Sequence, residues 1–328
     1  MGWTCLHVRS CCSRAGARAA SPLPRPRLIP RGSRAARRFA VAVIALVTIV
    51  GLVVPSAEAQ AQRLDVALEP ASPRAGDVVS VLVAAPPATT GVDVRAFDHQ
   101  WPVVRVDEVT WRGLVGIDLD RAAGVYDLTV ETTGSDSPLV HEDVLRVARR
   151  DFPRRVLKVA PQYVNPSPDL LARITREAAF LRDVFTMSDG KAAWANGLRR
   201  PVDARANSSF GTRSVFNGEP RSPHTGTDFL SGAGTPIHAP AGGRIVAARD
   251  LFFSGNTVVI DHGLGLFSTL AHLSRIDVRE GTTIERGEIV GLVGATGRVT
   301  GPHLHWALRL DAARVDPLAA LAVLPMQP

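Results

Sequence analysis

Short runs that alternate apolar and polar residues, separated by glycine, proline and other turn residues, fill two stretches of the chain. In the first stretch, strand-like runs recur at 78–86, 92–97, 103–109, 124–132 and 144–150. In the second, which begins at Pro201, they recur at 242–248, 256–262, 266–273 and 288–294. Alternation of this kind is typical of half-buried strands. We therefore predict a mainly β protein, with an immunoglobulin-like β-sandwich over residues 60–150, an antiparallel β domain over 200–318 and a tail over 319–328.

Between these stretches the apolar period becomes that of a helix. Ser167-Pro168-Asp169 supplies an N-cap residue, a first-turn proline and an acidic side chain. Apolar residues then recur at steps of three and four, at Leu171, Ile174, Ala178, Leu181 and Phe185. This single stripe predicts an amphipathic helix that ends before Gly190, within a linker over residues 151–199. The stripe favours packing on a neighbouring domain; a spacer or a dimerising seam is the alternative.

The N-terminal segment has the organisation of an export signal. An uncharged apolar run over residues 40–54 follows Arg37 and Arg38 and precedes Ala57-Glu58-Ala59. The run is shorter than a bilayer-spanning helix, and an A-x-A site follows it. We predict a signal peptide over residues 1–59 and a location in the periplasm or the extracellular cell envelope. An uncleaved membrane anchor is the alternative and the one membrane contact we expect.

The distribution of charge argues against a nucleic-acid partner. The 328-residue chain has a formal net charge of +7, but residues 1–60 hold nine arginines and one acidic residue, which leaves 29 basic and 30 acidic residues in the remainder. Nucleic-acid binding needs its cations on the folded surface. The three cysteines, Cys5, Cys11 and Cys12, also precede the apolar run, so the mature chain is expected to contain no disulfide.

The candidate metal-binding and catalytic residues are concentrated among the histidines of the second β stretch. His224 and Asp228 are four residues apart, and His303 and His305 are at positions i and i+2, which share a face on a strand. His272 lies in a third β segment. Imidazole and carboxylate groups are common zinc ligands. Each motif alone is weak, since two such histidines also occur on half-exposed strands, but together they predict a metal site.

The residues from about 200 to 317 resemble the lysostaphin-type and LytM-type zinc endopeptidases. The family's motifs occur in its order, as Ser209-Phe210-Gly211-Thr212-Arg213, His224-Thr225-Gly226-Thr227-Asp228, Ala271-His272-Leu273 and Thr300-Gly301-Pro302-His303-Leu304-His305. The resemblance implies that His224, Asp228 and His305 bind Zn²⁺ and that His272 and His303 are catalytic. It also implies a compact antiparallel β fold and hydrolysis of stem or cross-bridge peptides of peptidoglycan.

Chemically, the two catalytic histidines would activate water, stabilise the developing oxyanion and protonate the leaving amine; how they share these roles stays open. The sequence departs from the family at Leu270, where a tyrosine is frequent, and at His238, where an aromatic or apolar residue is usual. We expect His238 and His262 to be structural. Neither substrate-binding residues nor an oligomeric state is predicted.

Two other functions compete with a peptidoglycan endopeptidase. One is a catalytically silent LytM-like protein that activates a cell-wall amidase; such proteins lack metal ligands, whereas all five positions are filled here. The other is a secreted protease acting on glycine-rich proteins or on the walls of rival bacteria. In the endopeptidase, the N-terminal β domain and the helix are expected to position or shield the cleft.

Overall fold

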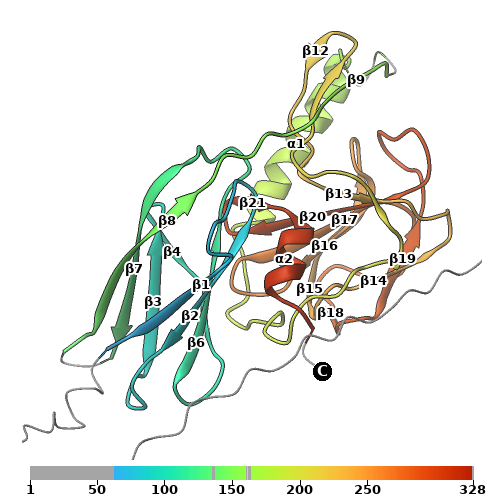
Figure 1. Ribbon diagram of the computed structural model, residues 1–328. Helices are drawn as coiled ribbons and strands as arrows, with labels where there is room; N and C mark the ends of the chain where they lie inside the picture. The colour runs from blue at the N-terminus through green and yellow to red at the C-terminus, as the bar shows by residue number, and fades with distance from the viewer. Residues whose placement is uncertain (1–62, 135–136, 160, 162–163, 327–328) are drawn as a thin grey trace, which may run out of the picture. The chain divides into compact units, whose positions relative to one another are not determined.

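The computed structural model describes residues 63–134, 137–159, 161 and 164–326 (Figure 1). The predicted signal peptide and the three cysteines lie outside these residues. The described chain is mainly β, as predicted. No helix within it is both long enough and apolar enough to span a bilayer.

The N-terminal region contains two four-stranded antiparallel sheets. The first has the order β1 (Asp65–Glu69), β2 (Val78–Ala84), β6 (Thr110–Gly116) and β5 (Val103–Arg105). The second has the order β4 (His99–Trp101), β3 (Gly91–Ala96), β7 (Gly124–Thr133) and β8 (Val140–Val147). Every second residue of β3 is buried, at Val92, Val94 and Ala96, as the alternating sequence requires. The immunoglobulin-like character of this region remains a prediction.

The expected helix is α1 (Pro168–Val184), and the Ser167 hydroxyl accepts a hydrogen bond from the Leu170 amide at 3.4 Å. Its C-terminal half is the packed part, because Phe180, Leu181, Val184 and Phe185 contact Ala247, Val259 and Phe267 of the large sheet. Leu171, at the other end of the predicted stripe, is exposed. The apolar packing on the C-terminal domain therefore lies at one end of the helix, while Arg173 in its first half donates a hydrogen bond to Asp250 of β15 (Gly243–Leu251) at 2.7 Å. Its function as a linker remains a prediction.

A small three-stranded sheet joins the segment before the helix to the segment after it. It has the order β12 (Glu219–Pro220), β11 (Arg213–Phe216) and β9 (Arg154–Leu157). β9 runs parallel to β11, with Arg155 opposite Ser214. Two segments about sixty residues apart in the chain thus lie side by side.

The C-terminal domain is built on one large sheet. Its main path is β10 (Ala206–Ser208), β13 (Gly226–Phe229), β20 (Leu304–Leu310), β17 (Leu266–Ile276), β16 (Gly255–Asp261), β15 (Gly243–Leu251) and β18 (Thr283–Ile284). The strands β14 (Pro236–His238), β19 (Ile289–Val293) and β21 (Ala313–Val315) pair beside this path. The helix α2 (Pro317–Val323) crosses the predicted domain end at residue 318, and Ala320 and Leu324 are buried. The domain boundaries themselves remain predictions.

Candidate metal centre and active site

The register of three strands brings the predicted site residues together. Asp228 on β13 lies opposite His305 on β20, and His305 lies opposite Ala271 on β17. Gly226 makes room for this arrangement, since a Cβ there would lie 2.7 Å from Cε1 of His305. His224 enters from the loop immediately before β13. Residues far apart in the sequence therefore meet because these strands are neighbours.

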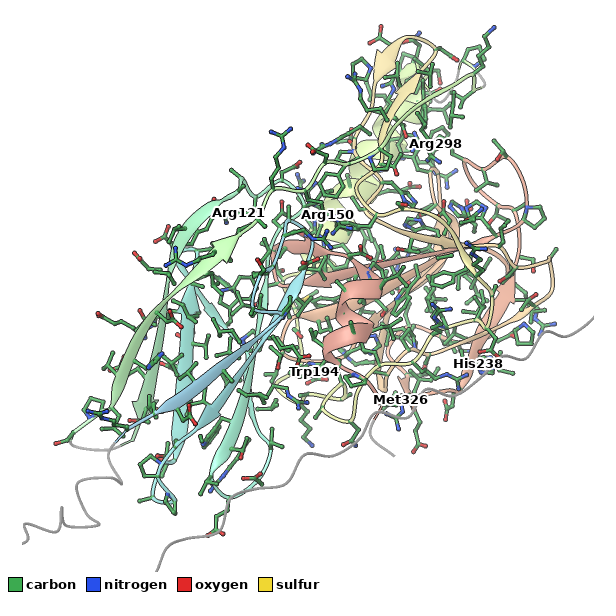
Figure 2. All side chains as sticks on the ribbon, in the orientation of Figure 1. Arg121, Arg150, Trp194, His238, Arg298 and Met326 are labelled. Atoms are coloured by element: carbon green, nitrogen blue, oxygen red, sulfur yellow. The ribbon has the colours of Figure 1, made fainter. Side chains whose placement is uncertain are left out.

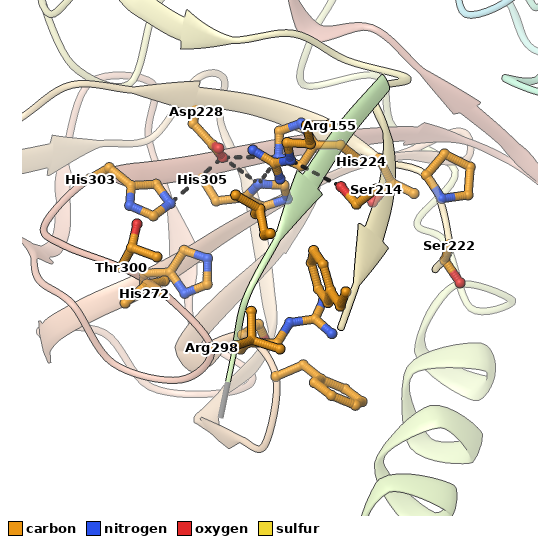
Figure 3. A pocket seen from close by; sticks show the side chains of 18 of the residues that line it. Arg155, Ser214, Ser222, His224, Asp228, His272, Arg298, Thr300, His303 and His305 are labelled. Carbon is orange, nitrogen blue, oxygen red and sulfur yellow. Dashed lines mark hydrogen bonds and ion pairs between the residues drawn. The ribbon is translucent and has the colours of Figure 1, made fainter. Parts of the chain in front are cut away.

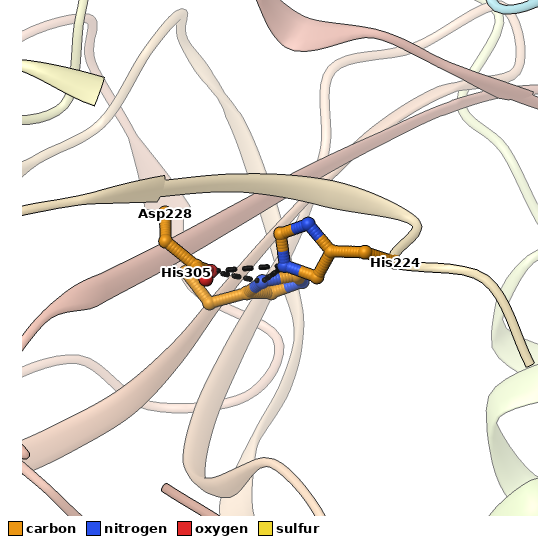
Figure 4. Close-up of side chains that lie close together, drawn as sticks. All are labelled: His224, Asp228 and His305. Carbon is orange, nitrogen blue, oxygen red and sulfur yellow. Dashed lines mark hydrogen bonds and ion pairs between the residues drawn. The ribbon is translucent and has the colours of Figure 1, made fainter. Parts of the chain in front are cut away.

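The three predicted metal ligands point their donor atoms at one another (Figure 4). Nε2 of His224 lies 3.0 Å from Oδ1 of Asp228 and 3.0 Å from Nδ1 of His305. Nδ1 of His305 lies 2.9 Å from the same carboxylate oxygen. All three side chains are largely buried. Two imidazole nitrogens and one carboxylate oxygen form a donor set that suits zinc.

The surroundings of His224 test whether this set fits a cation. Nδ1 of His224 lies 3.1 Å from the Ser209 carbonyl oxygen, which can only accept a hydrogen bond. A neutral His224 ring therefore carries its proton on Nδ1 and presents a lone pair from Nε2 to the Asp228 carboxylate. Two acceptors that face each other at this distance suit a shared cation, which is either a metal ion or a proton on Nε2. A backbone carbonyl on the far nitrogen is also the usual support of a metal-bound histidine.

The two predicted catalytic histidines lie beside this centre (Figure 3). His303 has Nδ1 2.9 Å from the Gly301 carbonyl oxygen and Nε2 3.7 Å from Oδ1 of Asp228. His272 has Nδ1 2.9 Å from the Thr296 carbonyl oxygen. Their ring centroids are 4.9 Å apart. Because backbone carbonyls hold both Nδ1 atoms, both Nε2 atoms are available for proton transfer in the pocket.

His272 occupies an irregular position in its strand. The pairing of β16 with β17 shifts between Asn256 and Val258, so that β17 carries an extra residue there. His272 itself has a φ of 69°, in the left-handed region that non-glycine residues seldom adopt. Bulges of this kind redirect a side chain, and unusual backbone conformations concentrate at functional sites.

The surroundings of Asp228 and His305 keep these two groups in the charge states that metal binding needs. Burial alone would raise the pKa of Asp228, but its contacts with the rings of His224 and His305 hold that pKa well below its usual range. Burial lowers the pKa of His305. Burial, followed by the charges of His305 and His303, lowers the pKa of His272 to about 3. At neutral pH the centre therefore combines an ionised carboxylate with neutral His272 and His305 rings.

These five residues line one pocket of about 530 Å³. The sequence did not predict its other wall, which contains Arg155 and Leu157 from β9, Ser214 and Phe216 from β11, and Arg298. No short motif marks the residues of β9 and β11, because their position depends on the long-range pairing of these two strands. Arg298 is held between aromatic rings, with its guanidinium 4.9 Å from the centre of Phe216 and 4.6 Å from that of Phe253.

The remaining candidates lie outside this pocket. His238 places Nδ1 2.8 Å from the Gly287 carbonyl oxygen and lies well away from Arg298 (Figure 2). His262 is fully buried between the Gly242 carbonyl oxygen and the Ser268 hydroxyl, at 2.6 and 2.8 Å. Both contacts fit the structural roles we expected. Leu270 is buried and does not line the pocket, so this departure from the family pattern lies in the core.

Comparisons with known proteins identify the family of the chain. Residues 222–317 match the model of peptidase family M23. A solved structure from Pseudomonas aeruginosa, described as a peptidase M23, is 33% identical with a TM-score of 0.60, over 76% of this chain and 95% of that one. The chain belongs to peptidase family M23, and the resemblance to lysostaphin-type and LytM-type enzymes is confirmed.

Curated relatives match over shorter stretches. The peptidoglycan DD-endopeptidase ShyA of Vibrio cholerae is 42% identical over 125 residues, which are 37% of this chain and 29% of ShyA. The DD-carboxypeptidase/endopeptidase Mpg of Neisseria meningitidis is 36% identical over 140 residues, which are 42% of this chain and 32% of Mpg. The matched part thus spans about a third of the length of these relatives.

Proposed function

We propose that the protein is a zinc-dependent endopeptidase that hydrolyses peptide bonds in the stem or cross-bridge peptides of peptidoglycan. The observation that carries this proposal is the convergence of three donor atoms at 2.9–3.0 Å beside two further histidines in one pocket. The names of ShyA and Mpg support peptidoglycan as the substrate. The complete ligand set favours an enzyme over a silent activator of an amidase.

His224, Asp228 and His305 would hold the zinc ion. When bound, zinc would act as a Lewis acid toward the scissile carbonyl and toward water. Asp228 contributes the one negative charge among the three ligands, so the loaded centre would keep a net positive charge. The Ser209 carbonyl fixes the ring of His224 in the tautomer that such binding requires.

His272 and His303 would move the protons. A neutral His272 can accept a proton on Nε2 while the Thr296 carbonyl holds its Nδ1–H in place. His303 is oriented in the same manner by Gly301 and is close enough to the centre to stabilise developing negative charge or to protonate the leaving amine. The geometry supports either division of these roles.

The proposed substrate also implies a place of action. Peptidoglycan lies outside the cytoplasm, so we propose that the protein is exported to the periplasm or the extracellular envelope. Cell fractionation with and without residues 1–59 tests this proposal; retention of the full chain in the cytoplasm would contradict it.

The release of peptides from purified peptidoglycan tests the activity. The full chain loaded with zinc should release new amino termini, a chelator should stop the release, and His305→Ala should abolish it. His238→Ala is the matched control, because it removes a histidine outside the pocket and should leave the rate unchanged. Absence of cleavage by the folded, zinc-loaded wild type would overturn the proposal and favour the amidase-activating alternative.

A further inference from the structure

One wall of the active-site pocket comes from residues outside the part of the chain that matches the family model. The match covers residues 222–317, whereas β9 and β11 end at Leu157 and Phe216. Both strands nevertheless line the pocket that contains the five histidine and aspartate side chains. The parallel pairing of Arg155 with Ser214 holds this wall together. The pocket thus has a side whose chemistry the family motifs do not describe.

The alternation along β9 separates its side chains into two sets. Arg155 and Leu157 are half-buried and line the pocket, while Arg154 and Val156 are exposed. Nε of Arg155 donates a hydrogen bond to the Ser214 hydroxyl at 3.0 Å (Figure 3). A guanidinium has five N–H donors, so this bond orients the group and leaves other donors for a ligand. Within the described part of the chain, no carboxylate forms an ion pair with Arg155.

The charges in the pocket are unbalanced. Arg155 and Lys158 are cations in its lining, and Asp228 is the one carboxylate among the lining residues. That carboxylate already faces His224 and His305. A zinc ion at the centre would add further positive charge. The pocket therefore favours an anionic group, and a planar guanidinium matches a carboxylate in particular because it can donate two parallel hydrogen bonds.

We propose that Arg155 is a substrate-binding residue that takes a carboxylate of the peptide next to the scissile bond. The proposal rests on the proposed peptidase function and names the chemistry by which the pocket selects its substrate. Arg155 sits on the wall facing the metal ligands, so the substrate would lie between β9 and the large sheet. The segment before the family domain then takes part in recognition.

Equilibrium binding tests this assignment without requiring turnover. The probes are three forms of one stem-peptide fragment: all carboxylates free, the side-chain carboxyls amidated, and the terminal carboxyl amidated. Calorimetry with the full chain, kept metal-free by a chelator, should show at least one amidated form binding about tenfold or more weakly, because hydrogen bonds to charged groups are the stronger ones. The weaker form identifies which carboxylate is bound.

Substitutions on the two faces of β9 complete the test. Arg155→Ala should abolish the preference for the free carboxylate, and Arg155→Lys should retain part of it. Arg154→Ala removes the same charge from the same strand on the exposed face, and it should keep the preference. In turnover by the zinc-loaded chain, Arg155→Ala should raise KM with kcat little changed.

Equal binding of all three peptides by the wild type, or an undiminished preference in Arg155→Ala, would overturn the inference. Failure of the proposed function gives a different result. In that case the zinc-loaded wild type cleaves neither the peptides nor peptidoglycan, while the carboxylate preference and its dependence on Arg155 persist in calorimetry.

Discussion

The two sides of the pocket differ in how the sequence encodes them. The metal-ligand side is built from β13, β17 and β20, whose motifs carry histidine and aspartate at short, recognisable spacings. The facing wall is built from β9 and β11, whose residues acquire a role through a parallel pairing across about sixty residues. Reactive groups thus come from the sheet, while selectivity comes from a wall added to it. Substitutions on the two sides should therefore have different kinetic consequences.

The largest effect is expected on the metal-ligand side. Asp228→Asn keeps the size of the side chain but removes the negative charge that two ring nitrogens face at 3.0 and 2.9 Å. Because the carboxylate is a proposed ligand and supplies that charge, the variant should bind less than one zinc per chain and lose the proposed peptidase activity. Metal analysis with an activity assay measures both. A variant that retained full metal content and activity would remove Asp228 from the ligand set.

The next largest effect is expected at the two histidines proposed to transfer protons. His303→Ala and His272→Ala should each lower kcat by about 10²–10⁴-fold while zinc remains bound, because general acid–base groups contribute about that much. Metal stoichiometry measured on the same samples distinguishes residues that transfer protons from residues that bind the metal. Loss of zinc in His303→Ala would make His303 a ligand instead.

A third prediction concerns the ion-pair network that links β21, beside the large sheet, to β11 in the facing wall. Arg314 on β21 donates to both carboxylate oxygens of Asp118, at 2.7 and 3.0 Å, and to Asp120 at 2.8 Å. Asp120 also accepts from Arg213, the first residue of the wall strand β11, at 2.7 Å. Arg314→Ala should lower the free energy of unfolding by about 1–3 kcal/mol, because it leaves the partly buried carboxylate of Asp118 without its main partner, while the exposed Asp120 keeps its bond with Arg213. Thermal unfolding measures the change.

The same network predicts that the stability of the protein depends on pH. Burial would raise the pKa of Asp118, but its hydrogen bonds with Arg314 outweigh burial and lower that pKa to about 2. Since the folded-state pKa is the lower one, this stabilisation is present above the unfolded value of about 3.9 and is lost as the pH falls toward 2. Arg314→Ala should make the free energy of unfolding depend less on pH between about 4 and 2. Arg275→Ala, which removes an exposed pair with Asp277, is the control and should change both quantities much less, because solvent screens that pair.

The smallest effect is expected on the wall. Ser214→Ala removes the hydroxyl that orients Arg155, so KM should rise about two- to tenfold, the range of a single hydrogen bond. Metal content and kcat should stay near the wild-type values, and Ser214→Thr should restore part of the affinity. A fall in kcat without a change in KM would show that the wall contributes to the catalytic step, and would contradict a role in substrate binding alone.

The same distinction explains how much could be predicted from the sequence. Strand periodicity indicated a mainly β chain, and the residues around Ser167 indicated the helix α1 with its N-cap. The motifs brought His224, Asp228, His272, His303 and His305 forward as one site, and the structure places them in one pocket. The role of Arg155 could not be predicted, because a single arginine on a short strand has no pattern until the strand's partner is known. The exposure of Leu171 was also unforeseen, since a stripe does not show how far a sheet extends beneath a helix.

The position of a bound zinc ion tests the central claim most directly. Crystals of the zinc-loaded full chain, measured at the zinc absorption edge, should show one anomalous peak within about 2.0–2.2 Å of Nε2 of His224, a carboxylate oxygen of Asp228 and Nδ1 of His305. A zinc peak at a different set of residues, or no peak between these three side chains in crystals grown with zinc, would contradict the account.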